Sequence, residues 1–561
     1  MSLKIGFLRL RSTRQVSIKC AVAFLLSLSV ILSGCLTNHQ PSNYYGEIVV
    51  PRTQEFRWSD GGLPQTFDPA FAAAAPDTDV VRALFEGLTD FDPQTLAPVP
   101  GVAKRWESSA DNREWTFYLR DDAKWSNGET VTAADFVRSW QRTLRIGPLA
   151  PHTELLSNLE GSSTRQLAGK PGNDSTAARG TAFGAEAVGD YVLRVRLHEG
   201  DASFPTLVAH PVFRPVKIVG SDPTHRLEAH ELISNGAFSF SGADNDRVLL
   251  ERAKTYWDGD AVELERVAFV GSSSAEDALS AYRSGNVDAV TNAPFEPLAL
   301  KLLSGYEDFR RFTFGALTYY SFNTAHAPFD DVRVREALAI AIDRERVSRD
   351  DLGGATEPAG KFLPQAISGE KPVVDKAELL EQDVPNARDL LAQAGFPNGD
   401  GFPIIRLLIN RNDQQRTVAQ AIAAMWQSVL GIQTEIIIKN WDEYENAFRT
   451  GDFDVVRRGL VMQTTDELTN LKMIFEGDRT TTTGDSLTSS SKQGESESQS
   501  VRRSLALSEA DALKELRAVP IYFASSFALV KPYVNGFDGN VLDAPSLKRT
   551  RMNTNWVDRK P

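Results

Sequence analysis

Short apolar runs rich in β-branched residues alternate with amphipathic helical segments between residues 403 and 459. The elements that this pattern predicts are strands at 404–409, 432–438 and 453–456 and helices at 414–430 and 441–450. The first helix carries Val418, Ile422 and Met425 at helical spacing, and Gly431 ends it. Strands that are separated by helices with short connections predict parallel pairing and right-handed crossovers.

A second unit of this kind lies earlier in the chain. Strands at 267–270 and 287–290 flank a helix at 275–284. Two such units far apart in the sequence predict an α/β protein with two lobes. Ligands of such sheets bind at the carboxyl ends of the strands. Arg457 follows directly after the strand expected at 453–456, so we expect it in a crevice.

Residues 1–34 begin with basic side chains, contain no acidic one, and include an apolar run at 21–32. That run is shorter than the roughly 20 residues of a membrane-spanning helix, and the pattern is typical of a secretory signal. The segment Leu32-Ser33-Gly34-Cys35 resembles the signal of bacterial lipoproteins, in which the cysteine is acylated and becomes the mature N-terminus. The alternative is an ordinary signal peptide with an incidental cysteine. We expect a protein outside the cytoplasm, tethered by lipid at Cys35, with a linker at 35–45.

The composition is acidic. The formal net charge is −13, and because the leader carries +5, residues 35–561 carry −18. This balance argues against nucleic acid and against an anionic membrane surface as partners. The body has no cysteine pair, so the 42% of hydrophobic residues must supply its stability, over about three to four domains. A polar stretch at 480–500 predicts a loop or a weakly held surface helix.

Residues 104–142 carry a run of aromatic motifs. They are Trp106-Glu107, WTFYLR at 115–120, AKWSNG at 123–128 and TVTAADFVRSW at 130–140. This region closely resembles the oligopeptide-binding proteins of ABC importers, the family-5 extracellular solute-binding proteins. Further matches follow in the family's order: Asp68-Pro69-Ala70, Phe85-Glu86-Gly87-Leu88, Ser234-Asn235-Gly236, Tyr256-Trp257, Tyr282-Arg283-Ser284-Gly285, PFDDVRVR at 328–335, Gly451-Asp452-Phe453-Asp454 and Val530-Lys531-Pro532. The resemblance covers nearly the whole chain after the leader and weakens between residues 460 and 500.

Most of these motifs have a structural explanation of their own. Thr132 with Asp135 is typical of a helix start. Asp330 or Asp331 can cap a helix that runs through Ile342. We therefore expect most motif residues to be scaffold, with the tryptophans in the core.

The resemblance implies a periplasmic-binding-protein-like fold of two α/β lobes, an extra subdomain on the first lobe, and a hinge where the chain crosses twice. The boundaries that it implies are residues 46–86, 218–318 and 532–561 for lobe one, 87–217 for the extra subdomain and 319–531 for lobe two. It also implies that the lobes close by a hinge motion over an extended peptide. Main-chain hydrogen bonds, as in strand addition, would hold such a peptide and tolerate many side chains.

Arg457 matches the family's arginine two residues before a glycine of the crevice, here Gly459. The resemblance implies that its guanidinium holds a ligand carboxylate through paired, charge-assisted hydrogen bonds. The alternative is a salt bridge to Asp454 or Asp452.

Five further residues are candidates for contact with the ligand. His210 matches a family histidine near the C-terminal end of the ligand, and a structural histidine is an equally good account. His326 stands where relatives often carry lysine, and it is either a pH-dependent cation or a solvated loop residue. Tyr319, Tyr320 and Asn323 lie at the crossing into lobe two, where backbone contacts to the peptide would be made. Packing explains the two tyrosines equally well.

Gln463 is the main departure from the family pattern. The family's peptide binders place an aspartate six residues after the arginine, where it meets the peptide's α-ammonium. Glutamine offers a carbonyl acceptor but no charge, and an enclosed ammonium without an anion costs several kcal/mol. Either the ligand lacks a free cationic α-amine, or Asp466 or Glu467 takes this role.

The sequence lacks the motifs of common enzymes. It has no Gly-x-Ser-x-Gly elbow, no Gly-x-Gly-x-x-Gly and no Walker loop. His225 and His230 are five residues apart, which is off the spacing for two zinc ligands on one helical face. Asn398-Gly399-Asp400-Gly401 has too few oxygen ligands in register for an EF-hand. We expect no catalysis, no cofactor and no metal.

Together these patterns predict a lipid-anchored receptor, periplasmic or at the cell surface, that captures an oligopeptide-like solute and delivers it to an ABC permease in the membrane. One alternative is the same fold with a non-peptide solute, such as a metal chelate, haem or an opine-like compound. Another is a surface lipoprotein for adhesion or sensing, and a third is a secreted hydrolase. Leu36, which is not an aspartate, would permit sorting to an outer membrane.

Overall fold

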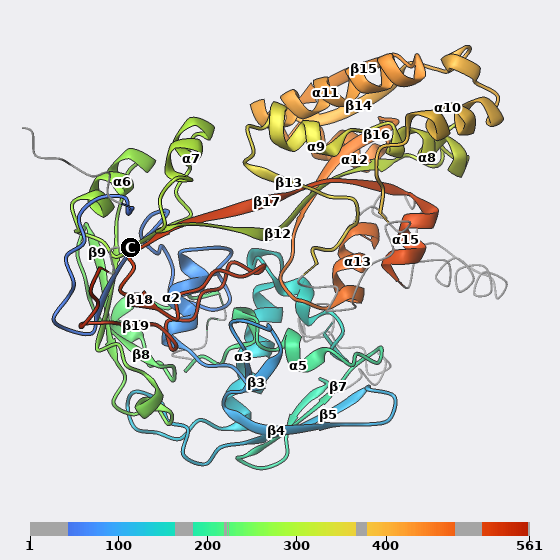
Figure 1. Cartoon of the computed structure of the whole chain (residues 1–561). Helices are drawn as coiled ribbons and strands as arrows, with labels where there is room; N and C mark the ends of the chain where they lie inside the picture. The colour runs from blue at the N-terminus through green and yellow to red at the C-terminus, as the bar shows by residue number, and fades with distance from the viewer. Residues whose placement is uncertain are drawn as a thin grey trace, which may run out of the picture.

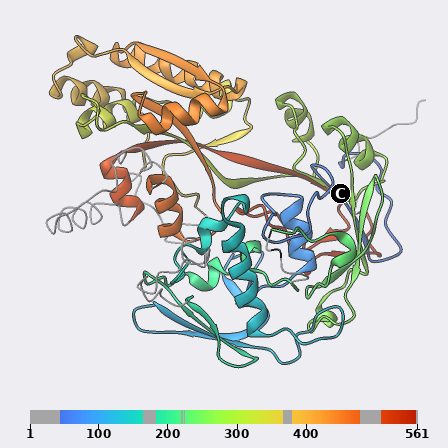
Figure 2. The ribbon, with the colours of Figure 1, turned by 180° about the vertical axis from the view of Figure 1, so that it is seen from behind.

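Two long strands join two bodies of the molecule. The computed structural model describes residues 43–162, 183–217, 222, 224–365, 379–476 and 508–558. The strands β12 (Phe309–Phe322) and β17 (Ala518–Val530) run from one body into the other (Figure 1). The same two strands link the bodies when the molecule is seen from behind (Figure 2). The architecture is the predicted two-lobed α/β fold.

One mixed sheet passes through both lobes. Its other strands are β1 (Glu55–Asp60), β8 (Phe238–Ala243), β9 (Arg247–Arg252), β10 (Arg266–Val270), β11 (Ala289–Thr291), β13 (Thr356–Pro358), β14 (Ile405–Asn410), β15 (Thr434–Lys439) and β16 (Val455–Val461). The strand order is β15-β14-β16-β12-β17-β11-β1-β10-β9-β8, and β13 pairs with β17. The strands of lobe two therefore lie at one end of the sheet and those of lobe one at the other.

The strand and helix unit expected between residues 403 and 459 is present in lobe two. The helices α11 (Asp413–Leu430) and α12 (Trp441–Thr450) connect β14, β15 and β16, and β14 pairs in parallel with both other strands. Gly431 ends α11 with a φ of +75°, which favours glycine.

The third strand of this unit is longer than expected. It continues to Val461, because residues 455–461 pair antiparallel with β12. Arg457 therefore lies inside β16, and its predicted place beyond the end of the strand is wrong. A partner strand so far away in sequence leaves no local signal at this position.

The unit expected in lobe one is also present. The helix α6 (Ala275–Arg283) connects β10 to β11, and both strands pair in parallel with β1, which lies between them. The Ser274 side chain accepts a hydrogen bond from the Asp277 N–H at 3.1 Å and caps this helix.

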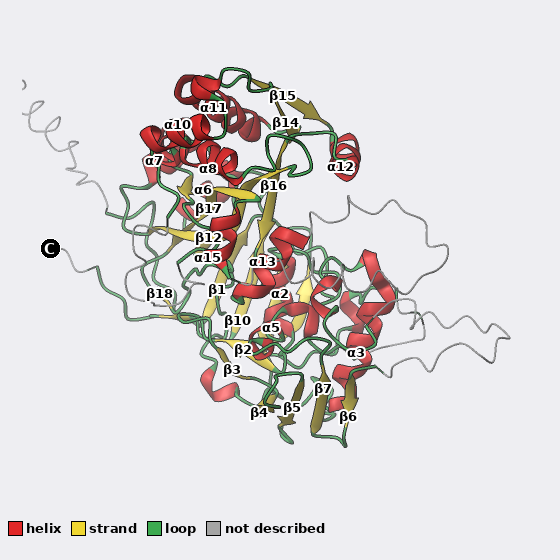
Figure 3. Cartoon of the chain, turned by 90° about the vertical axis from the view of Figure 1, so that its right-hand side faces the viewer, coloured by secondary structure: helices red, strands yellow, loops and turns green. Residues whose placement is uncertain are grey.

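The extra subdomain carries a separate antiparallel sheet and one long helix. Its strands, in the order β4-β5-β7-β6, are β4 (Ala103–Ser108), β5 (Glu114–Leu119), β7 (Val192–Arg196) and β6 (Ala185–Ala187). The helix α3 (Ala133–Ile146) begins as expected, because the Thr132 N–H donates to Asp135 Oδ2 at 2.8 Å. Trp140 is fully buried, in agreement with the expectation for the tryptophans. Figure 3 shows this sheet at the end of the molecule opposite α10 and α11.

The remaining elements are short. They are α2 (Asp77–Leu84), β2 (Thr89–Phe91), β3 (Pro98–Pro100), α5 (Phe204–Leu207), α7 (Pro297–Leu303), α8 (Val332–Ile340), α9 (Arg344–Arg346), α10 (Val384–Gln393), α13 (Glu467–Glu476), α15 (Glu509–Glu515), β18 (Val534–Asn535) and β19 (Arg551–Met552). Asp331, and not Asp330, caps α8, with the Arg333 N–H as donor at 2.9 Å. That helix ends at Ile340, two residues before the expected end. Among the described residues, no helix has the length and apolarity that a membrane span requires. Cys35 and the segment 480–500 lie outside the described residues.

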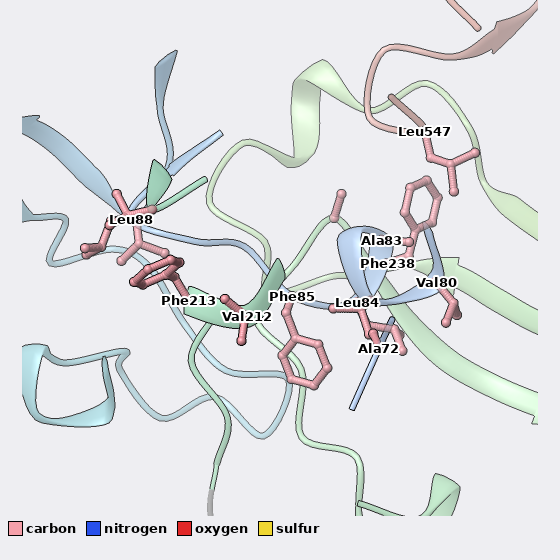
Figure 4. Close-up of a cluster of buried hydrophobic side chains, with 14 of the residues drawn as sticks. Ala72, Val80, Ala83, Leu84, Phe85, Leu88, Val212, Phe213, Phe238 and Leu547 are labelled. Atoms are coloured by element: carbon pink, nitrogen blue, oxygen red, sulfur yellow. The ribbon is translucent and has the colours of Figure 1, made fainter. Parts of the chain in front are cut away.

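Lobe one and the extra subdomain share one hydrophobic core. The cluster contains Phe56 and Trp58 of β1 together with Trp125 and Trp140 of the subdomain. Figure 4 shows where they join: the apolar side of α2 and Phe85 lie beside Val212 of the subdomain. A second cluster, built around α11 and β14, fills lobe two. Each body therefore has its own main core, with the subdomain belonging to the first. A third cluster, which includes Leu96, Leu317, Met462 and Val541, packs between the two bodies.

The register between the two connecting strands is interrupted at one place. Thr313 pairs with Ser525 and Leu317 with Phe523, so the pairing is irregular around Gly315. The Gly315 N–H donates to the Val541 carbonyl at 2.7 Å, and the Gly315 carbonyl accepts from Met462 N–H at 2.8 Å. An irregular stretch in the only strands that join the bodies, within the described residues, is a natural hinge point.

Candidate functional site

A cavity of about 620 Å³ lies between the extra subdomain and lobe two. The subdomain contributes one wall, from residues 154–158 and 198–207, and the segment 460–473 contributes the other. The lining residues include Leu155, Asp201, Leu207, Leu460, Asp466 and Met473. Because its walls come from two bodies, the size of this cavity depends on the angle between them.

Gln463 and His210 meet beside this cavity, and each comes from a different body. The Val212 N–H donates to Nδ1 of His210 at 3.2 Å, so the ring proton is on Nε2. That nitrogen donates to Gln463 Oε1 at 3.0 Å. The Gln463 amide nitrogen donates to the Val461 carbonyl at 3.1 Å. The amide oxygen and the amide nitrogen of Gln463 therefore both form hydrogen bonds within the protein.

His210 is neutral near pH 7. Its side chain is only 2% exposed, and burial lowers its pKa well below the usual value. The neighbouring His152, whose ring centre lies 4.9 Å away, and Arg82 lower the pKa further, and the hydrogen bond to Gln463 opposes them. His210 therefore links the two bodies as an uncharged donor.

Arg457 lies on lobe two with its guanidinium over a glycine. Nη2 donates to Thr318 Oγ1 on β12 at 3.3 Å. A Cβ added to Gly459 would lie 3.1 Å from that nitrogen, so glycine leaves room for the guanidinium. The Tyr444 hydroxyl donates to the Arg457 carbonyl. The pairing of β16 and the absence of a Cβ at Gly459 thus orient the Arg457 side chain.

The alternative salt-bridge partners of Arg457 are engaged elsewhere. Asp452 pairs with Arg406 at 2.6 Å, and Asp454 pairs with His326 at 3.2 Å. Within the described part of the chain, Arg457 forms no ion pair. Its charge is therefore available to an anion that the protein does not itself supply.

Tyr320 lies directly opposite Arg457 in the pairing of β12 with β16. Its hydroxyl is buried and has no hydrogen-bond partner among the described residues. Burial and, after it, Tyr522 raise its pKa, and Arg457 opposes this rise. Tyr522 accepts hydrogen bonds from Gln414 and Gln415, at the start of α11, at 3.2 and 2.9 Å. The hydroxyl of Tyr320 therefore lies near both Arg457 and the polar group formed by Tyr522 and the start of α11.

The other three candidates, Tyr319, Asn323 and His326, form contacts within the protein where the chain crosses into lobe two. Tyr319 packs in a different cluster from Tyr320, and its hydroxyl donates to the Ile474 carbonyl at 3.4 Å. Asn323 Nδ2 donates to the carbonyls of Gly451 and Phe453 at 3.2 and 3.1 Å. Nδ1 of His326, a 44% exposed side chain, lies within hydrogen-bond distance of Asp454 Oδ1, at 3.2 Å. All three thus have structural contacts, and a contact to a ligand stays a prediction.

Of the two aspartates that line the cavity, the sequence reading named Asp466 only as an alternative to Gln463 and missed Asp201. Asp201 and Asp466 line it from opposite bodies, and Lys472 on α13 reaches across to Glu199 at 2.6 Å. Each aspartate stands just before a short helix, a position that reads as a helix start in the sequence. Only the tertiary structure brings them to one cavity. In the described part of the chain, no group of three or more His, Cys, Asp or Glu side chains is placed to hold a metal ion.

Comparison with known proteins gives this fold a family. Residues 97–482 match the family described as bacterial extracellular solute-binding proteins, family 5 Middle. The chain belongs to this family. The periplasmic oligopeptide-binding protein OppA of Escherichia coli (strain K12) is 30% identical over 498 residues, which cover 86% of this chain and 89% of that protein.

Two solved structures show how the lobes are placed. The periplasmic murein tripeptide binding protein MppA, in its unliganded open form, matches with a TM-score of 0.73 at 27% identity over 90% of this chain and 98% of that one. A second structure, of the Escherichia coli murein tripeptide binding protein MppA, has the same identity and covers 90% of this chain and 99% of that one, with a TM-score of 0.62. The chain therefore superposes better on the structure described as unliganded and open.

Proposed function

We propose that this protein is the lipid-anchored receptor of an ABC importer, which captures oligopeptides outside the cytoplasm and delivers them to a permease. The observation that carries this proposal is the 620 Å³ cavity between two bodies joined by two strands. The family membership and the peptide-binding names of the relatives OppA and MppA support peptides as the ligand class.

Capture proceeds by closure of the bodies. Each body has its own main core, so each can rotate as a unit about the third cluster, which packs between them beside β12 and β17. The register break near Gly315 gives the connecting strands a place to bend. A ligand that contacts both walls of the cavity binds the closed arrangement better, and this difference in affinity drives closure.

Arg457 holds the carboxylate of the bound peptide. It has no ion pair among the described residues, and Gly459 leaves room for its guanidinium. Tyr522 and the first residues of α11 supply polar groups nearby. Transport requires only binding and release, so the peptide leaves chemically unchanged.

The test offers the purified protein a tryptic digest of casein and identifies what is retained by native mass spectrometry. We expect masses of intact digest peptides in the complex. Small-angle scattering of the same complex should give a smaller radius of gyration than the free protein. Retention of no peptide, or of a co-purified non-peptide solute that digest peptides do not displace, would contradict the proposal. Cleavage of the retained peptides would indicate a hydrolase.

A further inference from the structure

The segment 537–543 follows β17 and lies against both strands that join the bodies. We propose that this segment, here called the hinge brace, fastens the two strands to lobe one, and that pH controls its attachment through Asp543. The inference rests on the proposed function, because closure of the bodies bends these strands. It adds a control of the hinge to the binding of the ligand.

The first half of the hinge brace lies against β12. Nη1 of Arg310 donates to the Phe537 carbonyl at 2.9 Å and to Asp538 Oδ1 at 3.3 Å. Two residues farther along the strand, the Phe312 ring packs on Gly539. A Cβ on that glycine would overlap the ring, so the absence of a side chain lets the brace lie close to the strand.

The next contact is at the register break. The Gly315 N–H donates to the Val541 carbonyl at 2.7 Å, and the Gly315 carbonyl accepts from the Met462 N–H at 2.8 Å. Val541 belongs to the hinge brace, whereas Met462 directly follows β16 of lobe two. Gly315 therefore has one hydrogen bond to each side of the hinge, and a bend at this residue must move one of the two partners. The hinge brace keeps the partner on the side of lobe one in place.

Asp543 attaches the end of the hinge brace to β17. The Ser526 hydroxyl donates to its Oδ1 at 3.0 Å. Ser526 is also the residue of β17 that pairs with Phe312 of β12. The hinge brace thus holds both connecting strands at the same level, within a few residues of the register break.

Asp543 faces two other carboxyl groups of lobe one. Asp60, the last residue of β1, accepts from the Thr291 hydroxyl and the Asn292 amide, both at 2.7 Å. The Oδ2 atoms of Asp60 and of Asp79 on α2 are buried, and no other described residue donates to either. These two carboxyl groups form a hydrogen bond with one another, which requires a proton on one of them.

The charge of this pair acts on Asp543. Burial and, after it, the charge of Asp60 raise the pKa of Asp543 to about 6. Three polar or charged groups oppose this rise, those of Ser526, Arg82 and Asn292. Near pH 6, a small change in pH therefore changes the charge of the residue that fastens the hinge brace.

The two arginines on this side of lobe one already have carboxylate partners. Arg82 on α2 pairs with Asp79 at 3.0 Å. Arg310, which lines a small cavity together with Asp543, pairs with Asp538 at 3.3 Å. The charge that Asp543 gains on ionisation therefore meets cations that other carboxylates already neutralise.

Rising pH weakens the attachment of the hinge brace. A carboxyl group with a raised pKa in the folded state stabilises its contacts while it is protonated, and this contribution is lost as pH rises through that pKa. Ionised Asp543 is repelled by Asp60. As it moves away, Val541, two residues earlier, moves with it. The Gly315 N–H then loses its acceptor, and the strands at the register break become free to bend.

The test measures hydrogen exchange of the ligand-free protein by mass spectrometry at pH 5 and pH 7, with each rate corrected for the pH dependence of the chemical exchange. A peptide that contains Gly315 reports on the hinge, and one from β10 reports on lobe one. Asp543→Asn keeps an acceptor oxygen and cannot ionise. Gly539→Ala forces the hinge brace away from β12 at either pH. Asp383→Asn is the control, because Asp383 is exposed and caps α10 in lobe two at 3.1 Å.

We expect the protection at Gly315 in the wild type and in Asp383→Asn to fall by about fivefold or more from pH 5 to pH 7. It should stay below the protection of β10 at both pH values, because exchange then occurs by local release of the hinge brace. In Asp543→Asn it should stay high at both pH values, and in Gly539→Ala it should be low at both.

Four results would overturn the inference. They are unchanged protection at Gly315 in the wild type, a fall that persists in Asp543→Asn, high protection in Gly539→Ala at pH 7, and equal protection at Gly315 and β10, which would mean that lobe one opens as a whole. Because no ligand is present, retention of casein peptides decides separately whether the proposed function stands.

Discussion

Nε2 of His210 donates to Oε1 of Gln463 across 3.0 Å, and this hydrogen bond joins the extra subdomain to lobe two. The partners are 253 residues apart in sequence. The bond is between neutral groups, so it holds the bodies together weakly, by about 0.5–1.5 kcal/mol. An interaction of this size can break and re-form when the bodies rotate.

Gln463→Glu tests the neutral state of His210. The substitution keeps the length of the side chain and places a carboxylate against the imidazole N–H. We expect the pKa of His210 to rise by about 1–3 pH units, because an opposite charge favours the protonated ring. Nuclear magnetic resonance of the ring protons against pH measures this. His230, whose side chain is 75% exposed, is the internal reference, and an unchanged His210 titration would mean that the contact is absent in solution.

Gly315→Ala tests the register break between β12 and β17. A Cβ at this position would lie 2.9 Å from the Val541 carbonyl, a backbone atom that cannot move alone. We expect a loss of about 1–3 kcal/mol in the free energy of unfolding, measured by urea denaturation. Gly305→Ala is the control, because a Cβ there meets nothing within 4 Å. Equal stability of the two variants would show that the structure accommodates a Cβ at position 315 without strain.

Local patterns predicted the elements of both lobes well. The α11 segment shows why: its apolar spacing, its Asn412 cap and the glycine at its end all act within a few residues. The same holds for the start of α3 at Thr132. Where pairing is non-local the prediction failed, and β16 ran past its expected end because β12 stabilises it.

The candidate site was predictable only in part. Arg457 and Gln463 could be singled out by resemblance, and the structure places both on the segment from β16 to α13. Asp466 could be named from the sequence only as an alternative to Gln463, and Asp201 not at all, because it looks like a residue that begins a helix. Their meeting depends on the packing of two bodies, which no local pattern encodes.

Asp543→Asn tests a buried group of carboxylates in lobe one. Burial and, after it, the nearby charge of Asp60 raise the pKa of Asp543 to about 6. A carboxyl whose pKa is raised in the folded state contributes stability below its unfolded pKa, near 3.8, and loses it as pH rises to about 6. We expect the wild type to lose up to about 3 kcal/mol of unfolding free energy over that range.

The variant should remove that loss, because asparagine does not ionise. Its side-chain oxygen can still accept from Ser526 Oγ, which lies 3.0 Å from Asp543 Oδ1. Urea denaturation at pH 4, 5, 6 and 7 measures the effect, with Asp538→Asn as the control, since that side chain is 55% exposed. A variant that is less stable than the wild type at pH 7 would contradict the ionisation argument.

Cys35→Ser tests the lipid anchor. The segment Leu32-Ser33-Gly34-Cys35 predicts acylation of the cysteine thiol, which serine cannot replace. We expect labelled fatty acid to be incorporated into the wild type in bacterial cells and to be absent from the variant. Cys20→Ser, which changes the other cysteine within the leader, should label normally. Unchanged labelling of Cys35→Ser would contradict the anchor.

Arg457→Met tests the carboxylate site. The guanidinium has no ion pair among the described residues, so a bound carboxylate would be its main charged partner. We expect the substitution to weaken a peptide acid by about 2–5 kcal/mol, if the pair is enclosed, and to weaken the matching C-terminal amide much less. Titration calorimetry of both forms gives the two losses. Arg458→Met is the control, because Arg458 follows on the same strand and pairs with Glu445 at 3.5 Å. Equal losses for acid and amide would assign Arg457 a purely structural role, since a side chain that only supports β16 cannot distinguish the two ends of a ligand.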